Sequence, residues 1–240
     1  MREAINGKTI VIVGGTSGIG LEAAVALARE GAKLVVASRS DRNLHEARTR
    51  LGEVADVQRL DASDEVAVRE FFSRIQAFDH LVTTAAVPTA GPFLDQDSRA
   101  AQELIDSKFW SQYYSARYGA PKINPGGSIT FFSGIVSRKP LPGMSIFAAV
   151  GGAIESLTRA LALELAPTRV NCVTPGVIDT PAWAFLPEPQ REQQFAAIAD
   201  GLPVKRIGTP SDVIGVLLAL ICNGFMTGAV VDVDGGHRVT

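Results

Sequence analysis

Short runs of β-branched and other apolar residues alternate along the chain with longer amphipathic stretches. The short runs predict strands near residues 8–13, 33–37, 54–59, 79–84, 127–132, 168–174 and 229–233. The amphipathic stretches predict helices near residues 18–30, 41–51, 64–76, 97–119, 145–166 and 210–222. Strands and helices that alternate in this order are typical of a parallel sheet with helices on both faces. The chain is therefore expected to form an α/β fold with a doubly wound, seven-stranded parallel sheet.

Local signals support two of the helix starts and one buried helix face. Asp64 precedes an apolar helical stretch as an N-cap residue would, and residues 210–212 (Pro-Ser-Asp) begin another. In the predicted fifth helix, apolar side chains recur at spacings of three and four residues. They form one continuous stripe made of Val150, Ile154, Leu157, Leu161 and Leu165.

The domain organisation is simple. At 240 residues, with no internal repeat and no long linker, the chain is expected to form one domain over residues 1–240. The one irregular segment spans residues 181–205, where several prolines bracket a short helix-like stretch with three aromatic residues. It follows the sixth predicted strand, beside the carboxyl ends where open α/β sheets bind ligands. We interpret it as a hydrophobic lid over a substrate, with a passive surface excursion as the alternative.

Composition excludes several classes of function. A formal net charge of −2 gives no general attraction to nucleic acid or to anionic lipid. Cys172 and Cys222 lack metal-ligand or redox spacing, and the three histidines are isolated, so no metal site is expected. The first residues carry an acid and do not resemble a signal peptide, and no apolar run approaches eighteen residues. The sequence predicts a cytoplasmic protein without a membrane anchor.

A glycine-rich turn directly follows the first predicted strand and opens the first long helix. It contains Gly14, Thr16, Ser17, Gly18, Ile19 and Gly20. Glycines let the backbone approach a pyrophosphate, and the free amides of the helix start then hold the anion. Because the turn stands between a strand and a helix, with a second strand about twenty residues on, it predicts a Rossmann-type dinucleotide site.

Four motifs in this order resemble those of the short-chain dehydrogenases/reductases, almost from end to end. The turn at residues 13–20 matches that family's Thr-Gly-x-x-x-Gly-x-Gly except for Val13. Asp61-Ala62 resembles its adenine-contacting segment, and residues 228–236 resemble its last strand and turn. Residues 171–181 are similar to the segment that holds the nicotinamide carboxamide, which implies cofactor contacts for Pro175, Gly176, Ile178 and Thr180. The resemblance also implies contacts for Thr84 and Ala85, after the fourth strand.

The end of the second predicted strand indicates which cofactor is bound. An acidic residue there would bind the adenosine ribose hydroxyls and repel a 2′-phosphate. This chain instead has Ser38-Arg39-Ser40, in which a guanidinium and two hydroxyls can bind a phosphate. We therefore expect NADP(H) rather than NAD(H), with a solvated surface arginine as the alternative for Arg39.

The catalytic positions are where the chain departs from the family. The family uses a Tyr-x-x-x-Lys pair on the fifth helix, a Ser thirteen residues before the Tyr, and an Asn on the preceding helix. Alignment places Phe147 at the Tyr, Gly151 at the Lys, Gly134 at the Ser and Lys108 at the Asn. Phe147 has no proton to give to a carbonyl oxygen. A slip of one residue would place Ser133 in the serine position.

These changes suggest replacements. Because a cation is gained at position 108 and lost at 151, we hypothesise that Lys108 reaches into the space beside Gly151 and takes over the ribose contact. A solvated lysine on a helix face is the alternative. Ser133, Ser145, Lys108 or water are the candidate proton sources, and we take Ser133 and Lys108 as the candidate catalytic residues.

Three functions fit the sequence. The first is an NADP(H)-dependent oxidoreductase that transfers hydride to or from a small carbonyl, imine or iminium substrate without the usual tyrosine acid. The second is an NADP(H)-binding protein without redox turnover, such as a sensor, scaffold or inactive subunit. The third is a non-redox catalyst that keeps the cofactor as a scaffold, since a fold alone does not assign chemistry.

The predicted fourth helix carries an aromatic face. Trp110, Tyr113, Tyr114 and Tyr118 recur at spacings of one, three and four residues. The family resemblance implies a dimer face on the fourth and fifth helices, and aromatic enrichment suits an interface. We expect a homodimer or homotetramer, with a substrate cage as the alternative for these rings.

Overall fold

Seven parallel strands form one sheet in the order β3-β2-β1-β4-β5-β6-β7 in this computed structural model, which describes residues 2–86 and 89–240. The strands are β1 Thr9–Val13, β2 Lys33–Ser38, β3 Ala55–Arg59, β4 Phe78–Thr83, β5 Ile123–Phe132, β6 Arg169–Pro175 and β7 Val230–Val233. The chain order reverses between β1 and β4, which places the switch point of the sheet beside the glycine turn. The predicted doubly wound α/β fold is confirmed.

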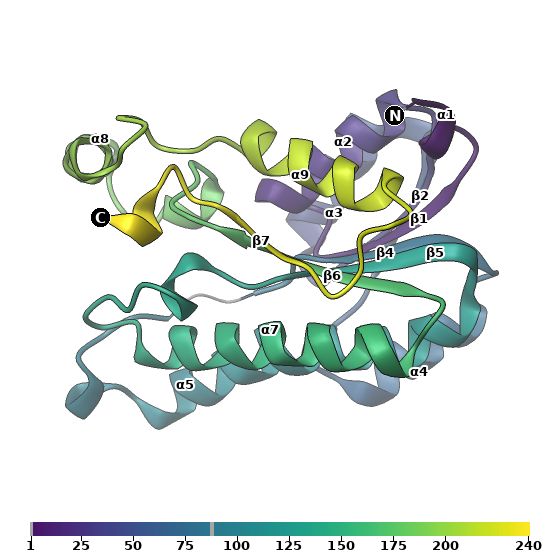
Figure 1. The fold of residues 1–240 in the computed structure, drawn as a ribbon, viewed down its shortest axis with the longest axis horizontal. Helices are drawn as coiled ribbons and strands as arrows, with labels where there is room; N and C mark the ends of the chain where they lie inside the picture. Colours follow the sequence, from purple (N-terminus) through teal and green to yellow (C-terminus); the bar gives the residue numbers. More distant parts are fainter. Residues whose placement is uncertain (1, 87–88) are drawn as a thin grey trace.

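Helices cover both faces of this sheet (Figure 1). One layer contains α2 Gly18–Arg29, α3 Asp41–Leu51 and α9 Pro210–Cys222, together with the short α1 Arg2–Ile5. The other contains α4 Glu65–Arg74, α5 Ser98–Leu104, α6 Ser111–Gly119 and α7 Ser145–Glu164. The helix α8 Glu188–Gly201 stands apart at the end of the sheet near the carboxyl terminus of the chain.

Alternation along the central strands builds one apolar core on each face. In β1, Ile10 and Ile12 pack with α2 and α9, whereas Val11 and Val13 pack with the helices of the opposite layer. All four side chains are almost fully buried. A strand buried on both faces has apolar residues at every position, which is why the continuous apolar run of residues 10–13 predicted this strand.

The predicted helix over residues 97–119 is continuous but not regular. Between α5 and α6 the segment η3, Ile105–Trp110, is a π-helix. Such a segment widens the backbone by one residue and often marks a functional site. Here it carries Lys108, whose side chain it directs into the interior of the protein.

The predicted helix starts are borne out with one refinement. Asp64 caps α4 by accepting hydrogen bonds from the amides of Val66 and Ala67 at 2.9 and 3.2 Å. At α9 the capping residue is Thr209, which forms a capping box with Asp212. Pro210 then takes the first helical position, where the lack of an N–H costs nothing.

By length and composition α7 could cross a membrane, with a mean hydropathy of 1.5; no other helix in the described ranges meets this test. The expectation that no uninterrupted apolar run approaches eighteen residues holds, but few charged residues interrupt this helix. In the fold α7 lies against the sheet (Figure 1), where it buries Val150 and Ile154. A core helix passes the same composition test, so this is weak evidence for a membrane span, and the cytoplasmic location stays a prediction.

The predicted lid, residues 181–205, contains more helix than the sequence indicated. A short 3₁₀ turn, Pro181–Trp183, leads into the fourteen-residue α8, none of whose residues is buried. The Trp183 ring packs edge-on against Phe195, with the ring centroids 5.3 Å apart, and donates to the Ile178 carbonyl oxygen. Closure of this segment over a substrate stays a prediction.

Candidate functional site

The glycine turn after β1 requires glycine for steric reasons. Gly14 adopts φ +88°, and a Cβ built there would lie 2.5 Å from the amide nitrogen of Ala85. A Cβ on Gly20 would overlap the carbonyl oxygen of Gly14. L-residues avoid the positive φ of Gly14, and neither site has room for a side chain. The turn is therefore folded tightly against the end of β4.

The turn leads into α2, whose first amides are not capped by a side chain. Helix α2 begins at Gly18, and its N-cap residue Ser17 makes no side-chain hydrogen bond to the helix. The first amides of a helix have no partner within it, and the helix dipole places positive charge at the same end. An anion such as a pyrophosphate fits this position.

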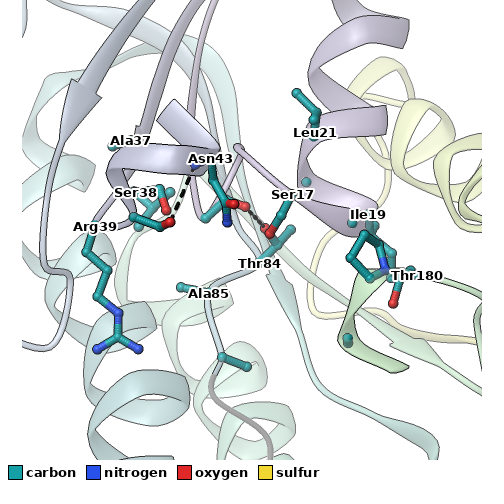
Figure 2. A pocket seen from close by; sticks show the side chains of 18 of the residues that line it. Ser17, Ile19, Leu21, Ala37, Ser38, Arg39, Asn43, Thr84, Ala85 and Thr180 are labelled. Carbon is teal, nitrogen blue, oxygen red and sulfur yellow. Dashed lines mark hydrogen bonds between the residues drawn. The ribbon is translucent and has the colours of Figure 1, made fainter. Parts of the chain in front are cut away.

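A cavity of about 1030 Å³ opens at this turn (Figure 2). Its walls come from the carboxyl ends of β1, β2 and β4, from the start of α2 and from the segment after β6. The predicted cofactor residues that line it are Gly14, Ser17, Gly18, Ile19, Gly20, Ser38, Arg39, Ser40, Asp61, Ala62, Thr84, Ala85 and Thr180. Residues from segments far apart in the sequence thus meet at one site.

Four other predicted cofactor residues are not among those that line the cavity: Thr16, Pro175, Gly176 and Ile178. Thr16 and Ile178 are buried. A Cβ on Gly176 would lie 2.7 Å from the Cα of Asp234, so this glycine permits the close approach of the last turn of the chain. Cofactor contacts by these four residues stay a prediction.

The end of the cavity beside β2, where the sequence predicts the adenosine and which we call the adenosine end, carries exposed positive charge. Arg39 is exposed and extends from the end of β2 (Figure 2). Ser40 does not point freely into the cavity, because its hydroxyl accepts from the amide of Asn43 at 3.4 Å and caps α3. Arg42, which the sequence analysis did not single out, also lines the cavity. Its place one residue inside a helix gave no sign of this in the sequence.

Asp61 lies beside this charge. Its carboxylate accepts from the amide and the hydroxyl of Ser63, at 3.0 and 2.6 Å. Partial burial acts to raise the pKa of Asp61, but these hydrogen bonds and the charge of Arg39 outweigh it, so the pKa lies below the usual value. The group is thus a carboxylate at neutral pH, able to accept hydrogen bonds from a ligand.

The opposite end of the cavity, where the sequence predicts hydride transfer and which we call the reaction end, offers few side chains that could donate or accept a proton. The Phe147 ring lines the cavity, and a Cβ on Gly134 would lie 3.2 Å from that ring. Two hydroxyls that the sequence analysis did not single out, those of Ser107 and Ser111, belong to the lining as well. Ser107 and Ser111 lie four residues apart, on either side of Lys108 in the sequence, and residues at this spacing share one face of a helix. This spacing was the sequence signal that could have identified them.

Lys108 is buried and does not line the cavity. Its ammonium donates to the carbonyl oxygens of Phe132 and Ser133 at 3.2 and 3.0 Å. It also lies 4.9 Å from the centre of the Phe147 ring. Burial lowers the pKa of this ammonium to about 8. The ammonium thus sits behind the aromatic ring that faces the cavity.

The predicted reach of Lys108 into the space beside Gly151 is wrong in this structure. That space is taken by Ser133 and Ser137, because a Cβ on Gly151 would lie 2.9 Å from the Oγ of the first and 2.9 Å from the Cβ of the second. The two carbonyl oxygens at the end of β5 attract the ammonium instead.

Ser133 also lies away from the cavity. Its hydroxyl donates toward the carbonyl oxygen of Gly151 at 3.0 Å and toward Glu155 Oε1 at 3.2 Å, and its side chain is buried. Successive residues of an extended segment point to opposite sides, so Gly134, not Ser133, faces the Phe147 ring. Ser133 and Lys108 are therefore neighbours behind the wall of the cavity, and a catalytic role for either stays a prediction.

Within the described ranges, no group of three or more His, Cys, Asp or Glu side chains could hold a metal ion. Cys172 is buried and Cys222 half-buried, and neither of these two thiols is in a disulfide.

Comparison with known proteins agrees with this geometry. The family model described as enoyl-(acyl carrier protein) reductase matches residues 13–238. The short-chain dehydrogenase/reductase ATR9 of Stachybotrys chlorohalonatus is 30% identical over 249 residues, which cover 97% of each chain. A solved small-chain dehydrogenase in complex with NADPH is 38% identical, with a TM-score of 0.87, over 98% of this chain and 100% of that one.

A further solved structure, the MalC reductase/Diels-Alderase of Malbranchea aurantiaca, is 25% identical with a TM-score of 0.91, over 100% of this chain and 99% of that one. The family match extends over nearly the whole chain, and the sheet order and the glycine turn fit it. The chain belongs to the short-chain dehydrogenase/reductase family of oxidoreductases.

Proposed function

We propose that the chain is an NADP(H)-dependent oxidoreductase that transfers hydride to or from a small carbonyl or imine substrate. The observation that carries this is the exposed Arg39 beside the glycine-lined cavity. The relative that is 38% identical and was solved in complex with NADPH supports it. A forked guanidinium matches a phosphate oxygen pair, whereas an acidic residue at this place would repel it.

The residues present fit such a cofactor. The start of α2 would hold the pyrophosphate, Arg39 and Ser38 the 2′-phosphate, and Thr180 the nicotinamide end. Gly14 and Gly20 leave the space that a Cβ would fill. When bound, NADPH would supply the hydride or NADP+ accept it, and the chain provides binding and orientation.

The reaction end has no tyrosine hydroxyl, so the proton must come from elsewhere. We propose that a water molecule supplies it. The buried cation of Lys108, behind the Phe147 ring, favours negative charge that develops on a substrate oxygen and disfavours a cationic substrate. A neutral carbonyl or neutral imine is thus favoured over an iminium ion by the charge of the site.

The test has two steps. Calorimetric titration with NADPH and NADH is expected to show tighter binding of NADPH. Consumption of NADPH, followed by its absorbance, is then measured against matched panels of ketones, aldehydes, neutral cyclic imines and pre-formed iminium ions. Turnover of any member supports the proposed reaction. Binding without consumption of NADPH by any member contradicts it.

That second outcome would favour the alternative, an NADP(H)-binding protein without redox turnover. The specific observation in its favour is that neither Lys108 nor Ser133 lines the cavity. A chain that binds the cofactor but accepts no substrate would serve as a sensor, a scaffold or an inactive subunit. The third possibility is a non-redox catalyst that keeps the cofactor as a scaffold. The solved relative that is named as both a reductase and a Diels-Alderase supports this possibility.

We also propose that the chain forms a homodimer or homotetramer through α5, α6 and α7. The rings of Trp110, Tyr113 and Tyr114 pack on one another and are half-buried. Only 28% of the apolar stretch of α7 is buried in the single chain. Light scattering is expected to give a multiple of 25.4 kDa, and Trp110→Asp to reduce it because a charge on the aromatic face opposes burial.

A further inference from the structure

Two adjacent glycines in α7 have different surroundings. A Cβ on Gly151 would lie 2.9 Å from Ser133 Oγ and 2.9 Å from Ser137 Cβ, which is closer than real Cβ atoms come. A Cβ on Gly152 would meet nothing within 4 Å. Neither glycine has a positive φ, so backbone conformation requires glycine at neither position. Only Gly151 is therefore required by the space around it.

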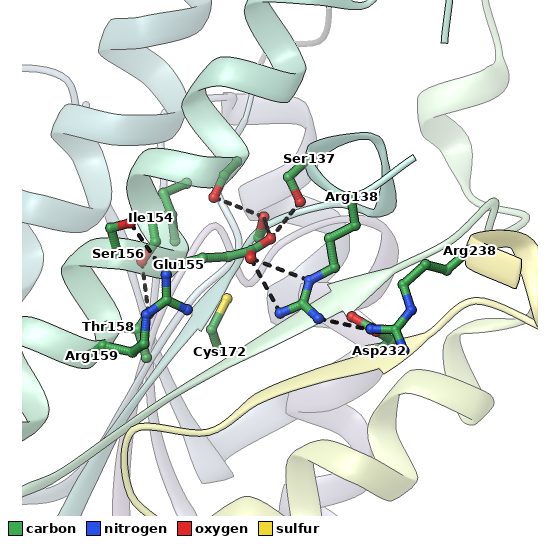
Figure 3. A network of polar contacts seen from close by, with 12 residues as sticks. Ser137, Arg138, Ile154, Glu155, Ser156, Thr158, Arg159, Cys172, Asp232 and Arg238 are labelled. Atoms are coloured by element: carbon green, nitrogen blue, oxygen red, sulfur yellow. Dashed lines mark hydrogen bonds and ion pairs between the residues drawn. The ribbon is translucent and has the colours of Figure 1, made fainter. Parts of the chain in front are cut away.

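The atoms that fill this space are held by a carboxylate one helical turn further on (Figure 3). Glu155 is buried, and its Oε1 accepts from the hydroxyls of Ser133, at 3.2 Å, and of Ser137. Residues four apart lie on the same face of a helix, so Glu155 lies beside the place where a side chain at 151 would be. The carboxylate thus fixes Ser137 against Gly151.

A buried carboxylate is costly unless it is paired, and this one is paired through a chain of charges. Arg138 bonds Oε2 of Glu155 at 3.2 Å and also reaches Asp232 Oδ2 at 3.3 Å. Arg238 bonds the same oxygen of Asp232 at 2.7 Å. The polar cluster, defined as Ser133, Ser137, Arg138, Glu155, Asp232 and Arg238, therefore ties α7 to the loop after β5 and to β7 (Figure 3).

We propose that Ser137, fixed by Glu155, closes position 151 to every side chain and so prevents α7 from presenting a cation at the reaction end of the cavity. Phe147 lines that cavity one turn before Gly151. The space that a side chain at position 151 would need is therefore filled by Ser133 and Ser137. The closure of position 151 means that α7 supplies no cation there to bind the cofactor or the substrate. The closure does not depend on whether the chain turns over NADPH.

Two alanine substitutions in the same helix test this first. Gly152→Ala is expected to raise Tm by about 1–4 °C, because alanine favours a helix and the added methyl meets open space. Gly151→Ala is expected to lower Tm by about 2–10 °C, because the methyl overlaps Ser133 and Ser137. If Gly151→Ala melts at or above the wild-type temperature, position 151 is not closed and the proposal fails.

A pair of substitutions at Ser137 then identifies the atom responsible. The hydroxyl of Ser133 can rotate away, whereas Ser137 Cβ is attached to the loop backbone and cannot. Ser137→Gly removes that Cβ, so Gly151→Ala is expected to cost less than half as many degrees in this background. Ser137→Ala keeps the Cβ but removes the hydroxyl that Glu155 holds, and it is expected to reduce the cost of Gly151→Ala by less than Ser137→Gly does. Equal costs in all three backgrounds would contradict the role of Ser137.

A gain-of-function variant gives the functional arm. Phe147→Tyr with Gly151→Lys is expected to lower Tm and to gain no ketone reduction, because the lysine stem cannot enter. A double variant that melts like the wild type and reduces a ketone would overturn the proposal. If the proposed function fails, that is, if the wild type consumes no NADPH, the melting temperatures of the glycine and serine variants still test the closure of position 151 independently.

Discussion

The two ends of the cavity differ in what holds them together. At the adenosine end, glycines and helix amides form the site, and most of the residues expected there line the cavity. At the reaction end, the expected side chains, Lys108 and Ser133, lie behind the wall and bond other parts of the protein. One end is formed by backbone atoms, and at the other the expected side chains bond within the protein.

The difference follows from how each kind of site is specified. A backbone site depends on φ and on the absence of side-chain atoms, as at Gly14, and few other residues can satisfy it. A side-chain site depends on where flexible groups find partners. The Lys108 ammonium donates to two carbonyl oxygens. The Glu155 carboxylate pairs with Arg138 and accepts from the hydroxyls of two serines. Both arrangements satisfy buried polar groups without a ligand.

The largest effect is expected from the charge at the adenosine end. Arg39→Ala removes a charge-assisted hydrogen bond to the 2′-phosphate, worth about 1.5–3 kcal/mol. NADPH is therefore expected to bind about 10–100-fold more weakly, while the affinity for NADH, which lacks that phosphate, is unchanged. Calorimetric titration with both cofactors measures the two values.

Lys33→Ala is the matched control for this experiment. Lys33 is an exposed cation at the opposite end of the same strand, β2, so its removal changes net charge equally without touching the cavity. If Lys33→Ala weakens NADPH binding as much as Arg39→Ala does, the effect is one of overall charge. The adenosine end would then not be the specific phosphate site that we propose.

A smaller effect, opposite in sign, is expected for stability at the reaction end. Lys108→Met replaces a buried ammonium, whose hydrogen bonds go to carbonyl oxygens, with an apolar chain of similar length. Removal of a buried charge raises the free energy of unfolding by up to a few kcal/mol. Loss of the hydrogen bond to the Ser133 carbonyl oxygen offsets part of this gain. A net gain of about 1–2 kcal/mol in the free energy of unfolding is expected from urea denaturation.

The pH dependence of this gain gives a second measurement. The pKa of Lys108 is about 8 in the folded protein, against 10.5 for a free lysine side chain. The folded state thus releases its proton first as pH rises, and the unfolded state binds more protons between these values. Wild-type stability relative to Lys108→Met is expected to rise from about pH 8 to pH 10.5. A difference in stability that does not change with pH would contradict the lowered pKa of Lys108. Weaker NADPH binding by Lys108→Met at neutral pH would instead favour a contact between Lys108 and the cofactor ribose.

The sequence predicted the sheet and the adenosine end because their determinants are local. Alternating strands and helices, the spacing of Gly14, Gly18 and Gly20, and Arg39 after β2 each depend on a few neighbouring residues. The reaction end could not be predicted this way. Whether Lys108 turns toward Gly151 or toward the carbonyl oxygens of β5 depends on which acceptors the fold brings within reach.

The polar cluster around Glu155 likewise could not be predicted from the sequence. Nothing in the sequence places Ser133, Arg138 and Asp232 together, since they lie in a strand end, a loop and the last strand. Even so, the sequence has two adjacent glycines at 151 and 152, and glycines inside a helix are unfavourable enough to indicate that a neighbour needs the space. The structure assigns that need to Gly151 alone.

The smallest effect sharpens the comparison between the two ends. If the adenosine end provides most of the affinity, adenosine 2′,5′-bisphosphate is expected to bind within about tenfold of NADPH, a difference of about 1.4 kcal/mol or less. The physical reason is that position 151 presents no cation to the nicotinamide ribose and Phe147 offers no hydroxyl. Competition calorimetry measures the ratio, with adenosine 5′-monophosphate as the control that lacks the 2′-phosphate. A fragment that binds a thousandfold more weakly than NADPH would show that the reaction end holds its half of the cofactor firmly, by contacts other than those of position 151.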